Sequence, residues 1–598
     1  MSIQKYSVNQ HPIQTLLTWV RSEEIAIPEI QRPFVWQGSK VRDLIDSLYQ
    51  GYPVGYLIAW RNPTVKLKDG TASQGKRILI DGQQRVTALM AAILGMHVIN
   101  KDYQRVKITI AFNPQEQRFE VSNPAIAKDK SWFSDISEIF APDFKVLKFV
   151  GEYCDRNENT DQDAIYNSLE LLRGVVNNHI GLIELNSDLD IEVVTEIFIR
   201  INSQGAVLNQ ADFVMSKIAA NETYGGNKLR KCIDYFCHLA KAPQFYQQLA
   251  DLDQEFAATT YFQKMSWLKD ENDDLYDPSY SDMLRVAFTS EFKRGRLQDL
   301  VALLSGRNFE TRTYEDAIAE ESFRKLDEGI LKFMNETNFK KFIMILKSAG
   351  FVEPSMIRSR NAINFAYVIY LALKSKSTTP AKIESHVRRW LVMSILTGRY
   401  SGSPESTFDT DIRRIDELGM SRYQSEIEAA ELSQAFWDAG LPQQMDTSVA
   451  SSPYFKVFLA AQVHGNNKGF LSKDITVRDL IMNRGDIHHI FPKNYLRRNN
   501  LEKGQYNQIA NYVMMQSEIN IAIKDRSPDQ YFVTLQEQCK TQQPTYGGII
   551  DQNELDKNFA DHCLPNGMEV KNIDDYTEFL EARRKLMSHK IRDYYFKL

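Results

Sequence analysis

Four residues near the C-terminal end of this 598-residue chain have types and spacing that suit hydrolytic chemistry. Two adjacent histidines occur in the stretch GDIHHIFPKNYL, and two asparagines follow at 22 and 31 residues after the second; the set is His488, His489, Asn511 and Asn520. A neutral imidazole can take a proton from water. A second imidazole and an amide oxygen can hold a divalent metal with open positions. Alternatively, the histidines cap a hairpin and the asparagines serve turns, and spacing alone leaves both interpretations open.

A second group of residues suits phosphate binding. The stretch RILIDGQQRVTALMAAILGMHV places Gly82, Gln83, Gln84 and Arg85 between two apolar runs. Glycine allows a tight turn, and the first turn of a helix offers free N–H groups and a positive dipole end. Arg85 adds a cation that the dipole disfavours by about 0.3–1 kcal/mol, which a bound phosphate would offset. The alternative is an ion pair between Arg85 and Asp81 or another acid. The glycine pattern and the Lys-Ser/Thr pair of a P-loop are missing.

Elements that could position these groups can be read from hydrophobic periodicity. Residues 77–81 predict a strand, and the apolar residues from Gln83 onward recur at helical spacing. Further strands are expected at 52–60, 105–113 and 179–186. The pattern turns helical at about 190 and stays mostly helical to about 440. A polar stretch with prolines near both ends, at 440–452, predicts a linker before a last unit that ends in a helix.

Composition excludes several classes of protein. With 43% hydrophobic and 25% charged residues, the chain is typical of a soluble protein of several domains. The net charge of −5 provides no general basic field, so any contact with DNA must come from a local patch. Five scattered cysteines without a framework indicate reduced thiols in a cytoplasmic protein. We expect no membrane span, because neither an apolar signal core nor an 18-residue apolar run occurs.

The histidine stretch carries a resemblance. HHIFPKNYL followed by NQIANYVMMQSEINIAIKDRSP resembles the His-Asn-Asn form of the HNH (ββα-metal) nucleases, in particular the C-terminal domain of GmrSD-type modification-dependent restriction enzymes. The resemblance implies that His489 is the general base and that Asn511 braces the loop carrying it. It implies that His488 and Asn520 hold a single divalent metal, Mg²⁺ or Mn²⁺. An acid is common at the position of His488, so Asp486 is an alternative ligand.

The N-terminal part resembles the same family independently. IPEIQRPFVWQGSKVRDLIDSLYQGYPVGYLIAW, ILIDGQQRVTAL and IFIRINSQGAVLNQADFVMSKI resemble the three signature blocks of the GmrS-type domain, which has a ParB/sulfiredoxin-like fold. The resemblance implies a site that binds and hydrolyses a nucleoside triphosphate, GTP or ATP. The implied residues are Asp81, Gly82, Gln83, Gln84, Arg85, Gln31, Arg32, Arg200, Asn202 and Ser203. The structural alternatives are that Gln31 and Arg32 fix a loop and that Arg200 pairs with Glu196.

Together these patterns predict an α+β multidomain protein. We expect a ParB/sulfiredoxin-like nucleotide-binding domain at 1–224, a helical middle region at 225–440 and a ββα-metal (HNH) nuclease domain at 441–598. The resemblance implies a type IV restriction endonuclease for antiphage defence, regulated by nucleotide. Its partner would be double-stranded DNA, in particular modified phage DNA, and we allow for a homodimer. The alternatives are a non-cleaving ParB-like nucleic-acid-binding regulator and an NTPase-gated nonspecific nuclease toxin.

Dense aromatic residues near the first block add one weaker signal. They are Phe34, Trp36, Tyr52, Tyr56 and Trp60. Flipped bases stack on aromatic rings, so these side chains could line a pocket for a modified base. Side chains of this kind also form ordinary cores.

Overall fold

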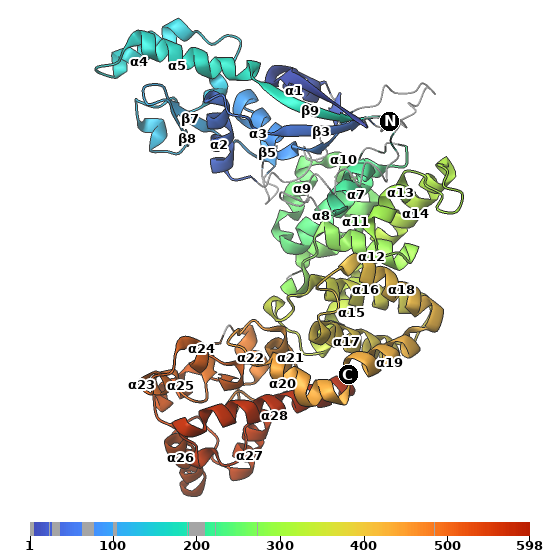
Figure 1. The fold of residues 1–598 in the computed structure, drawn as a ribbon, viewed down its shortest axis with the longest axis vertical. Coiled ribbons are helices and arrows are strands. Elements are labelled where there is room, and N and C mark those ends of the chain that lie inside the picture. Colours follow the sequence, from blue (N-terminus) through green and yellow to red (C-terminus); the bar gives the residue numbers. More distant parts are fainter. Residues whose placement is uncertain are drawn as a thin grey trace. The chain divides into compact units, whose positions relative to one another are not determined.

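The computed structural model divides into two compact units (Figure 1). Unit 1 comprises Met1–Ala257 with Leu297–Arg324, and unit 2 comprises Ala258–Arg296 with Lys325–Leu598. The fold is mixed α and β and mostly helical, as expected, while the ParB/sulfiredoxin-like and ββα-metal assignments and the three-domain division stay predictions. The structure describes residues 5–22, 24–26, 36–61, 77–99, 105–187, 189, 210–219, 221, 223–271, 273–483 and 485–598. The predicted site residues outside these ranges are Gln31, Arg32, Arg200, Asn202 and Ser203.

A five-stranded mixed sheet organises unit 1 (Figure 1). Its order is β1 (Tyr6–Pro12), β9 (His179–Leu185), β3 (Tyr56–Arg61), β4 (Arg77–Asp81) and β2 (Ile25–Ala26). The β1–β9 and β3–β4 pairs are antiparallel, and the β3–β9 and β2–β4 pairs are parallel. The strand predicted at 179–186 is confirmed. The strand predicted at 52–60 begins only at Tyr56, because Gly51 and Gly55 turn the chain at positive φ just before it.

An apolar core joins this sheet to several helices. Among them are α1 (Ile13–Arg21), α2 (Gly38–Tyr49) and α3 (Gln83–Leu94). In α2 the buried residues recur at helical spacing, namely Val41, Leu44, Ile45 and Leu48. Burying each such side chain contributes about 1.5–3 kcal/mol. Helix α3 is buried along most of its length, so the turn at its N-terminus is held on a rigid element.

The rest of unit 1 is two small ladders and further helices. β5 (Val98–Ile99) pairs with β6 (Arg105–Val106), and β7 (Ile110–Asn113) pairs with β8 (Arg118–Val121). The single strand predicted at 105–113 is therefore wrong, because its two ends pair with different neighbours. The helices are α4 (Val146–Arg156), α5 (Gln162–Gly174), α7 (Gln210–Ala219), α8 (Gly226–Lys241), α9 (Tyr246–Leu252), α10 (Gln254–Ala257), α13 (Leu297–Leu304) and the start of α14 (Asp316–Phe333).

The first part of unit 2 is helical, as the periodicity of the middle region predicts. Its helices are the rest of α14, α11 (Thr260–Lys264), α12 (Tyr280–Phe292), α15 (Glu336–Ser348), α16 (Arg360–Ser375), α17 (Pro380–Thr397), α18 (Pro404–Leu418) and α19 (Met420–Glu431). Helix α16 is buried along twelve consecutive residues, 362–373, because apolar side chains surround it. It packs between α12 and α17.

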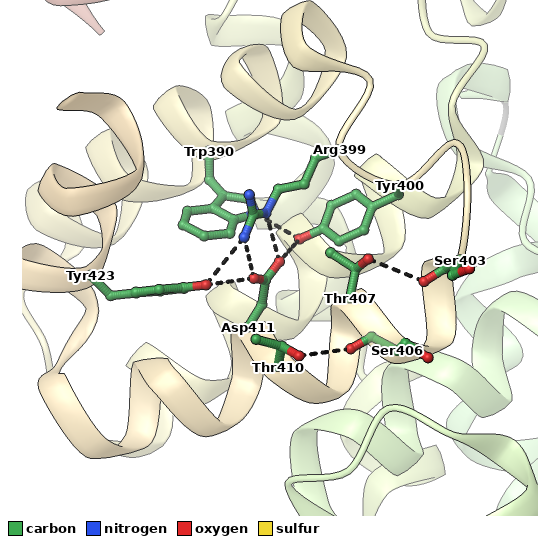
Figure 2. Close-up of polar contacts among 9 residues, drawn as sticks. All are labelled: Trp390, Arg399, Tyr400, Ser403, Ser406, Thr407, Thr410, Asp411 and Tyr423. Atoms are coloured by element: carbon green, nitrogen blue, oxygen red, sulfur yellow. Dashed lines mark hydrogen bonds and ion pairs between the residues drawn. The ribbon is translucent and has the colours of Figure 1, made fainter. Parts of the chain in front are cut away.

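A buried ion pair crosses these helices (Figure 2). The carboxylate of Asp411 on α18 has no solvent exposure, and Arg399 donates to both of its oxygens, with Nε lying 2.8 Å from Oδ2. The hydroxyl groups of Tyr400 and Tyr423 donate to the same carboxylate at 2.8 and 2.7 Å. A charge so deeply buried is tolerated only when it is paired and hydrogen-bonded. The network therefore fixes how α17, α18 and α19 pack.

The last part of unit 2 surrounds a short two-stranded ladder. Strand β10 (Ile487–His489) pairs with β11 (Tyr512–Met514), and α25 (Ser517–Ile523) follows. The other helices are α20 (Leu441–Gln444), α21 (Pro453–His464), α22 (Val477–Met482), α23 (Lys493–Arg498), α24 (Lys503–Tyr506), α26 (Pro528–Thr541), α27 (Gln552–Asp561) and α28 (Tyr576–Lys597). The stretch expected as a linker begins with fully buried Leu441 and Met445, and α20 packs against α28. In the described part of the chain, no helix has both the length and the apolar character needed to cross a membrane.

Candidate functional site

The histidine pair lies on the first strand of the small ladder in unit 2. His488 is opposite Val513 and His489 is opposite Tyr512 in the antiparallel register. Strand β10 ends at His489, three residues before Pro492, which cannot donate a ladder hydrogen bond. Helices α23 and α24 lie between β10 and β11 in the chain, and Asn520 lies on α25, which follows β11. The sequence-predicted residues of this site therefore come from β10, the segment just before β11, and α25.

The imidazole of His489 is held by two neighbours. Its Nε2 lies 3.0 Å from Oδ1 of Asn507, and its ring packs edge-on against Tyr512 with 5.2 Å between the ring centroids. An amide oxygen can only accept, so in this arrangement Nε2 carries the proton and Nδ1 keeps a lone pair. Burial lowers the pKa of His489, the bond to Asn507 opposes this, and the charge of Lys493 lowers the pKa further. His489 is therefore a neutral base at neutral pH.

Asn507 is a site residue that sequence reasoning missed. It follows α24 and is separated from His489 by eighteen positions in the chain. The signal that could have found it is weak. Asn507 is one of three amide residues in the segment NQIAN and lies four residues before Asn511. Asn507 selects the imidazole tautomer, which is a role typical of the groups that orient a general base.

Asn511 braces the chain that follows His489. It has no solvent exposure. Its Oδ1 accepts from the N–H of Phe491 at 2.8 Å, and its Nδ2 donates to the carbonyl oxygens of Phe491 and Tyr506 at 3.1 and 3.3 Å. Its own carbonyl accepts from the N–H of Ile490 at 2.9 Å. The side chain thus continues the ladder past His489, and its burial suits a positioning residue rather than one that contacts substrate.

His488 presents a buried nitrogen that lacks a hydrogen bond. Among the described residues its Nε2 has no partner. Burial lowers the pKa of His488, and the nearby charge of Asp486 opposes this, so the ring is neutral with a lone pair at one nitrogen. Asn520 is half-buried on α25. Within the described ranges no three His, Cys, Asp or Glu side chains gather to hold a metal ion. This absence does not test the predicted ligand pair, which consists of one histidine and one asparagine.

Helix α28 anchors the second strand through a buried arginine. Arg583 has no solvent exposure, and its Nη1 donates to the carbonyl oxygens of Ala510 and Tyr512 at 2.7 and 3.0 Å. Its Nε donates to the carbonyl of His562 at 3.1 Å. Burial lowers the pKa of Arg583 to about 10, so the side chain remains a cation at neutral pH. A long-range contact of this kind fixes the strand opposite His489.

The glycine turn in unit 1 has the predicted shape. Strand β4 ends at Asp81, Gly82 has a φ of 90°, and α3 begins at Gln83. A Cβ atom on Gly82 would lie 2.3 Å from Cδ2 of Leu57, so the turn requires glycine for both its conformation and its packing. The buried side chain of Gln83 donates from Nε2 to the carbonyl of Leu79 at 2.6 Å. Gln83 therefore holds the turn instead of facing a ligand.

Arg85 contacts a neighbouring strand. Its Nη1 donates to the carbonyl of Tyr56 at 2.7 Å, and its guanidinium carbon lies 3.4 Å from where a Cβ atom on Gly55 would be. Among the residues that the structure describes, Arg85 makes no ion pair with Asp81 or any other acid. The cation therefore lies beside the N-terminus of α3 with its charge uncompensated in this part of the chain. That is the electrostatic setting in which an anion binds.

The aromatic residues near the first block divide into two groups. Tyr52 and Tyr56 are 63% and 55% exposed. Tyr56 is the first residue of β3, and Tyr52 precedes the strand. Trp60 is buried, and Trp36 packs against the core of unit 1. Phe34 lies outside the described residues. In the described ranges only the two tyrosines of this group are exposed, and Tyr56 is the one that Arg85 contacts, so these aromatic side chains do not together form the predicted base pocket.

Comparisons with known proteins concern both units. Residues 13–219, about a third of the chain, match the family described as GmrSD restriction endonuclease, N-terminal domain. An uncharacterized protein of Methanocaldococcus jannaschii is 22% identical over an alignment of 641 positions, which covers 97% of this chain and 98% of that protein. The second similarity therefore includes the histidine site as well as the glycine turn. The turn from Asp81 to Arg85 lies inside the matched family range, and the N-terminal part of this chain is similar to the N-terminal domain of GmrSD restriction endonucleases.

Proposed function

We propose that this chain is a GmrSD-type restriction endonuclease that cuts double-stranded DNA at His489. The family match of residues 13–219 supports a restriction-type nuclease. The observation that carries the cleavage site is the bond between His489 Nε2 and Asn507, because it leaves Nδ1 of a neutral imidazole able to accept a proton. The order of β10, β11 and α25 is the order expected of a ββα-metal nuclease.

In the proposed reaction His489 acts as general base. Nδ1 takes a proton from a water molecule, whose oxygen forms a new bond to the phosphorus of the scissile phosphate while the bond to the leaving oxygen breaks. The positive charge that develops on the imidazole is stabilised by Asn507, because the Nε2–H donates more strongly from an imidazolium ring. Asn511 keeps the loop after His489 in place.

The residues at His488 fit a divalent metal, Mg²⁺ or Mn²⁺. A buried imidazole nitrogen without a hydrogen bond is costly unless something occupies it. His488 would hold the ion with the amide oxygen of Asn520, and waters would complete the set. When bound, a divalent cation stabilises the negative charge of the phosphate and of the leaving oxygen.

Basic groups beside His489 would contact the DNA backbone. Lys493 is exposed and lies four residues after His489, and its charge lowers the pKa of that imidazole. Its Nζ lies 5.8 Å from the centre of the Tyr506 ring. Arg497 follows on the same helix, α23, and is exposed. A local cluster of this kind would supply the attraction to phosphate that the net charge of the whole chain cannot.

Nucleotide at the glycine turn would regulate cleavage. The uncompensated cation Arg85 and the free N–H groups of α3 are suited to the phosphates of GTP or ATP. In this proposal the nucleotide state changes the arrangement or the assembly of the chain and thereby licenses cutting of modified phage DNA. The modification, the nucleotide and a homodimer are parts of the proposal, and a cleavage assay tests the modification and the nucleotide.

The test is a cleavage assay on matched modified and unmodified phage DNA. The purified full chain is assayed with Mg²⁺ or Mn²⁺, with and without GTP or ATP. His489→Ala is the test variant, and His386→Ala is a control in the helical part of unit 2. We expect cleavage of modified DNA that falls by at least about a hundredfold in His489→Ala and is unchanged in His386→Ala. Full cleavage by His489→Ala would refute the assignment, and no cleavage by the wild type under any condition would favour a non-cleaving regulator.

A separate measurement tests the glycine turn. Binding of GTP and ATP is measured for the wild type, Arg85→Ala and a control, Arg156→Ala, which removes an exposed arginine of α4 in the same unit. Removing the cation beside the phosphates is expected to weaken binding by about tenfold or more. Equal affinity in the wild type and Arg85→Ala would show that the nucleotide does not use this turn. In the cleavage assay, equal cutting of modified and unmodified DNA would favour a nonspecific nuclease toxin.

A further inference from the structure

An open pocket of about 540 Å³ lies in unit 2, and none of its lining residues belongs to the His489 site. It is formed by the end of α21 and the turn after it, the end of α27, and the C-terminal half of α28. Sites for small molecules commonly have volumes of roughly 300–1,000 Å³. This volume is enough for a ligand larger than a single ion.

One corner of the pocket holds the cation of Lys597 beside the imidazole of His464, whose lowered pKa keeps it neutral at neutral pH. The exposed residues His464 and Lys597 line it, and the ring of His464 packs edge-on against Tyr594 at 5.3 Å. Burial lowers the pKa of His464, and the charges of Arg388 and Lys597 lower it further, with no acid acting in the opposite direction. Lys597 makes no ion pair with any residue in the described ranges. This corner therefore attracts an anion.

Oxygen acceptors line other parts of the pocket. Asp561 lies 3.7 Å from Lys590, and Asp593 lies 3.2 Å from Arg592, so each carboxylate has one ionic partner among the described residues. Asn467 is 8% exposed, and its Oδ1 has no hydrogen-bond partner in the described part of the chain. That oxygen has almost no accessible surface, so the two carboxylates are the acceptors that a ligand in the pocket reaches. These oxygens are suited to the hydroxyl and amino groups of a ligand.

An apolar wall completes the pocket. Ala461, Leu564 and Leu586 line it, and Leu586 is 38% exposed. A flat heterocycle would cover such a wall and remove apolar surface from water. The three kinds of surface together suit a molecule with an anionic group, several donors and a flat apolar body.

We propose that this pocket binds a small phosphorylated molecule of the nucleoside monophosphate class. The phosphate lies at Lys597 and accepts from the imidazole of His464, the sugar hydroxyls and base amino groups donate to Asp561 and Asp593, and the base covers the apolar wall. The site is separate from the proposed nucleotide turn at Arg85, which belongs to unit 1. It does not depend on the proposed nuclease function, because none of its lining residues takes part in that chemistry.

The first test is calorimetric titration of the full chain with AMP. The double variant His464→Gln/Lys597→Gln removes the cation and the imidazole of this corner, and Lys585→Gln is a matched control, an exposed lysine of α28 outside the pocket. We expect AMP to bind the wild type and Lys585→Gln alike, and the double variant to bind at least about tenfold more weakly. Absence of binding at about 5 mM AMP, or equal binding by the double variant, would overturn the proposal.

Two further arms separate the sources of binding. Arg85→Ala should bind AMP as the wild type does; loss of binding in that variant would place AMP at the turn in unit 1 and overturn the inference while supporting the turn as a nucleotide site. Inorganic phosphate should bind more weakly than AMP, and equal affinity would overturn the nucleoside class. Photolabelling with 8-azido-AMP should modify peptides that contain residues 461–467 or 586–597. Labelling confined to other peptides would contradict the proposal independently of how the variants fold.

Discussion

Replacing Asn511 with alanine would test whether the loop after His489 is held by a single side chain. The variant removes one acceptor and one donor that pair with the backbone of Phe491. The carbonyl of Tyr506 keeps the hydroxyl of Tyr576 at 3.3 Å, so it is not orphaned. Two buried groups remain without partners, each costing about 1–3 kcal/mol, so we expect Asn511→Ala to lose about 2–6 kcal/mol of unfolding free energy. That is a large share of the 5–15 kcal/mol typical of a domain.

The assay has a global and a local readout. Urea unfolding followed by far-ultraviolet circular dichroism gives the stability of unit 2, and hydrogen exchange measured on peptides covering 487–496 reports the amide of Phe491. Asn507→Ala is the matched control, because Asn507 is half-buried and, among the described residues, its side chain bonds only to His489. It should lose less than about 1.5 kcal/mol and leave the exchange of these peptides unchanged, while lowering DNA cleavage because the tautomer of His489 is no longer selected.

Two results would refute the reasoning. An unfolding free energy for Asn511→Ala within about 0.5 kcal/mol of the wild-type value would mean that these groups find other partners. Unchanged exchange at Phe491 would show that the loop is held by something other than Asn511. If Asn507→Ala cut DNA at the wild-type rate, the tautomer argument would fail although the bracing by Asn511 could stand.

Three further predictions concern the two units. Gly82→Ala should destabilise unit 1 by at least about 1–2 kcal/mol, because φ is 90° and the added methyl group would clash with Leu57. The control Gly151→Ala in α4 places its methyl group in open space and should stabilise the unit by about 0.5–1 kcal/mol. Chemical denaturation compares the two variants, and equal stabilities would contradict the strain at Gly82. Arg399→Met leaves the carboxylate of Asp411 buried without its cation (Figure 2), so the unfolding free energy of unit 2 should fall by about 3–5 kcal/mol. Thermal unfolding measures this change, and an unchanged midpoint would mean that the network contributes nothing to stability. Burial lowers the pKa of His562 to about 3 from 6.5, so the unfolded chain binds more protons than the folded chain between these pH values. The unfolding free energy should therefore be highest above pH 6.5 and fall as the pH decreases towards 3, by about 2 kcal/mol at pH 5. His562→Gln should remove this part of the pH dependence, as measured by urea unfolding.

Parts of both candidate sites could be predicted because their signals are local. The turn from β4 to α3 was predicted from an apolar run, a glycine and helical spacing within 18 residues, and the structure confirms it. The strand at 179–186 was predicted in the same way. The strand predicted at 105–113 was wrong because its halves choose different partners, a choice that alternation within one segment does not contain. Likewise, the polar stretch at 440–452 begins with residues that are buried against α28.

The sequence by itself determined which chemical groups this protein has and which local elements carry them: an imidazole pair on a strand, amides in the following segment, and an arginine just after a glycine turn. Only the tertiary structure decided what those groups contact. Asn507 meets His489 across eighteen positions, Arg85 reaches the carbonyl of Tyr56 across 29, and Arg583 reaches Tyr512 across 71. The physical reason is that periodicity depends on neighbours along the chain. The partner of a buried donor or acceptor depends instead on which distant segments pack together, and burial then makes that hydrogen bond obligatory.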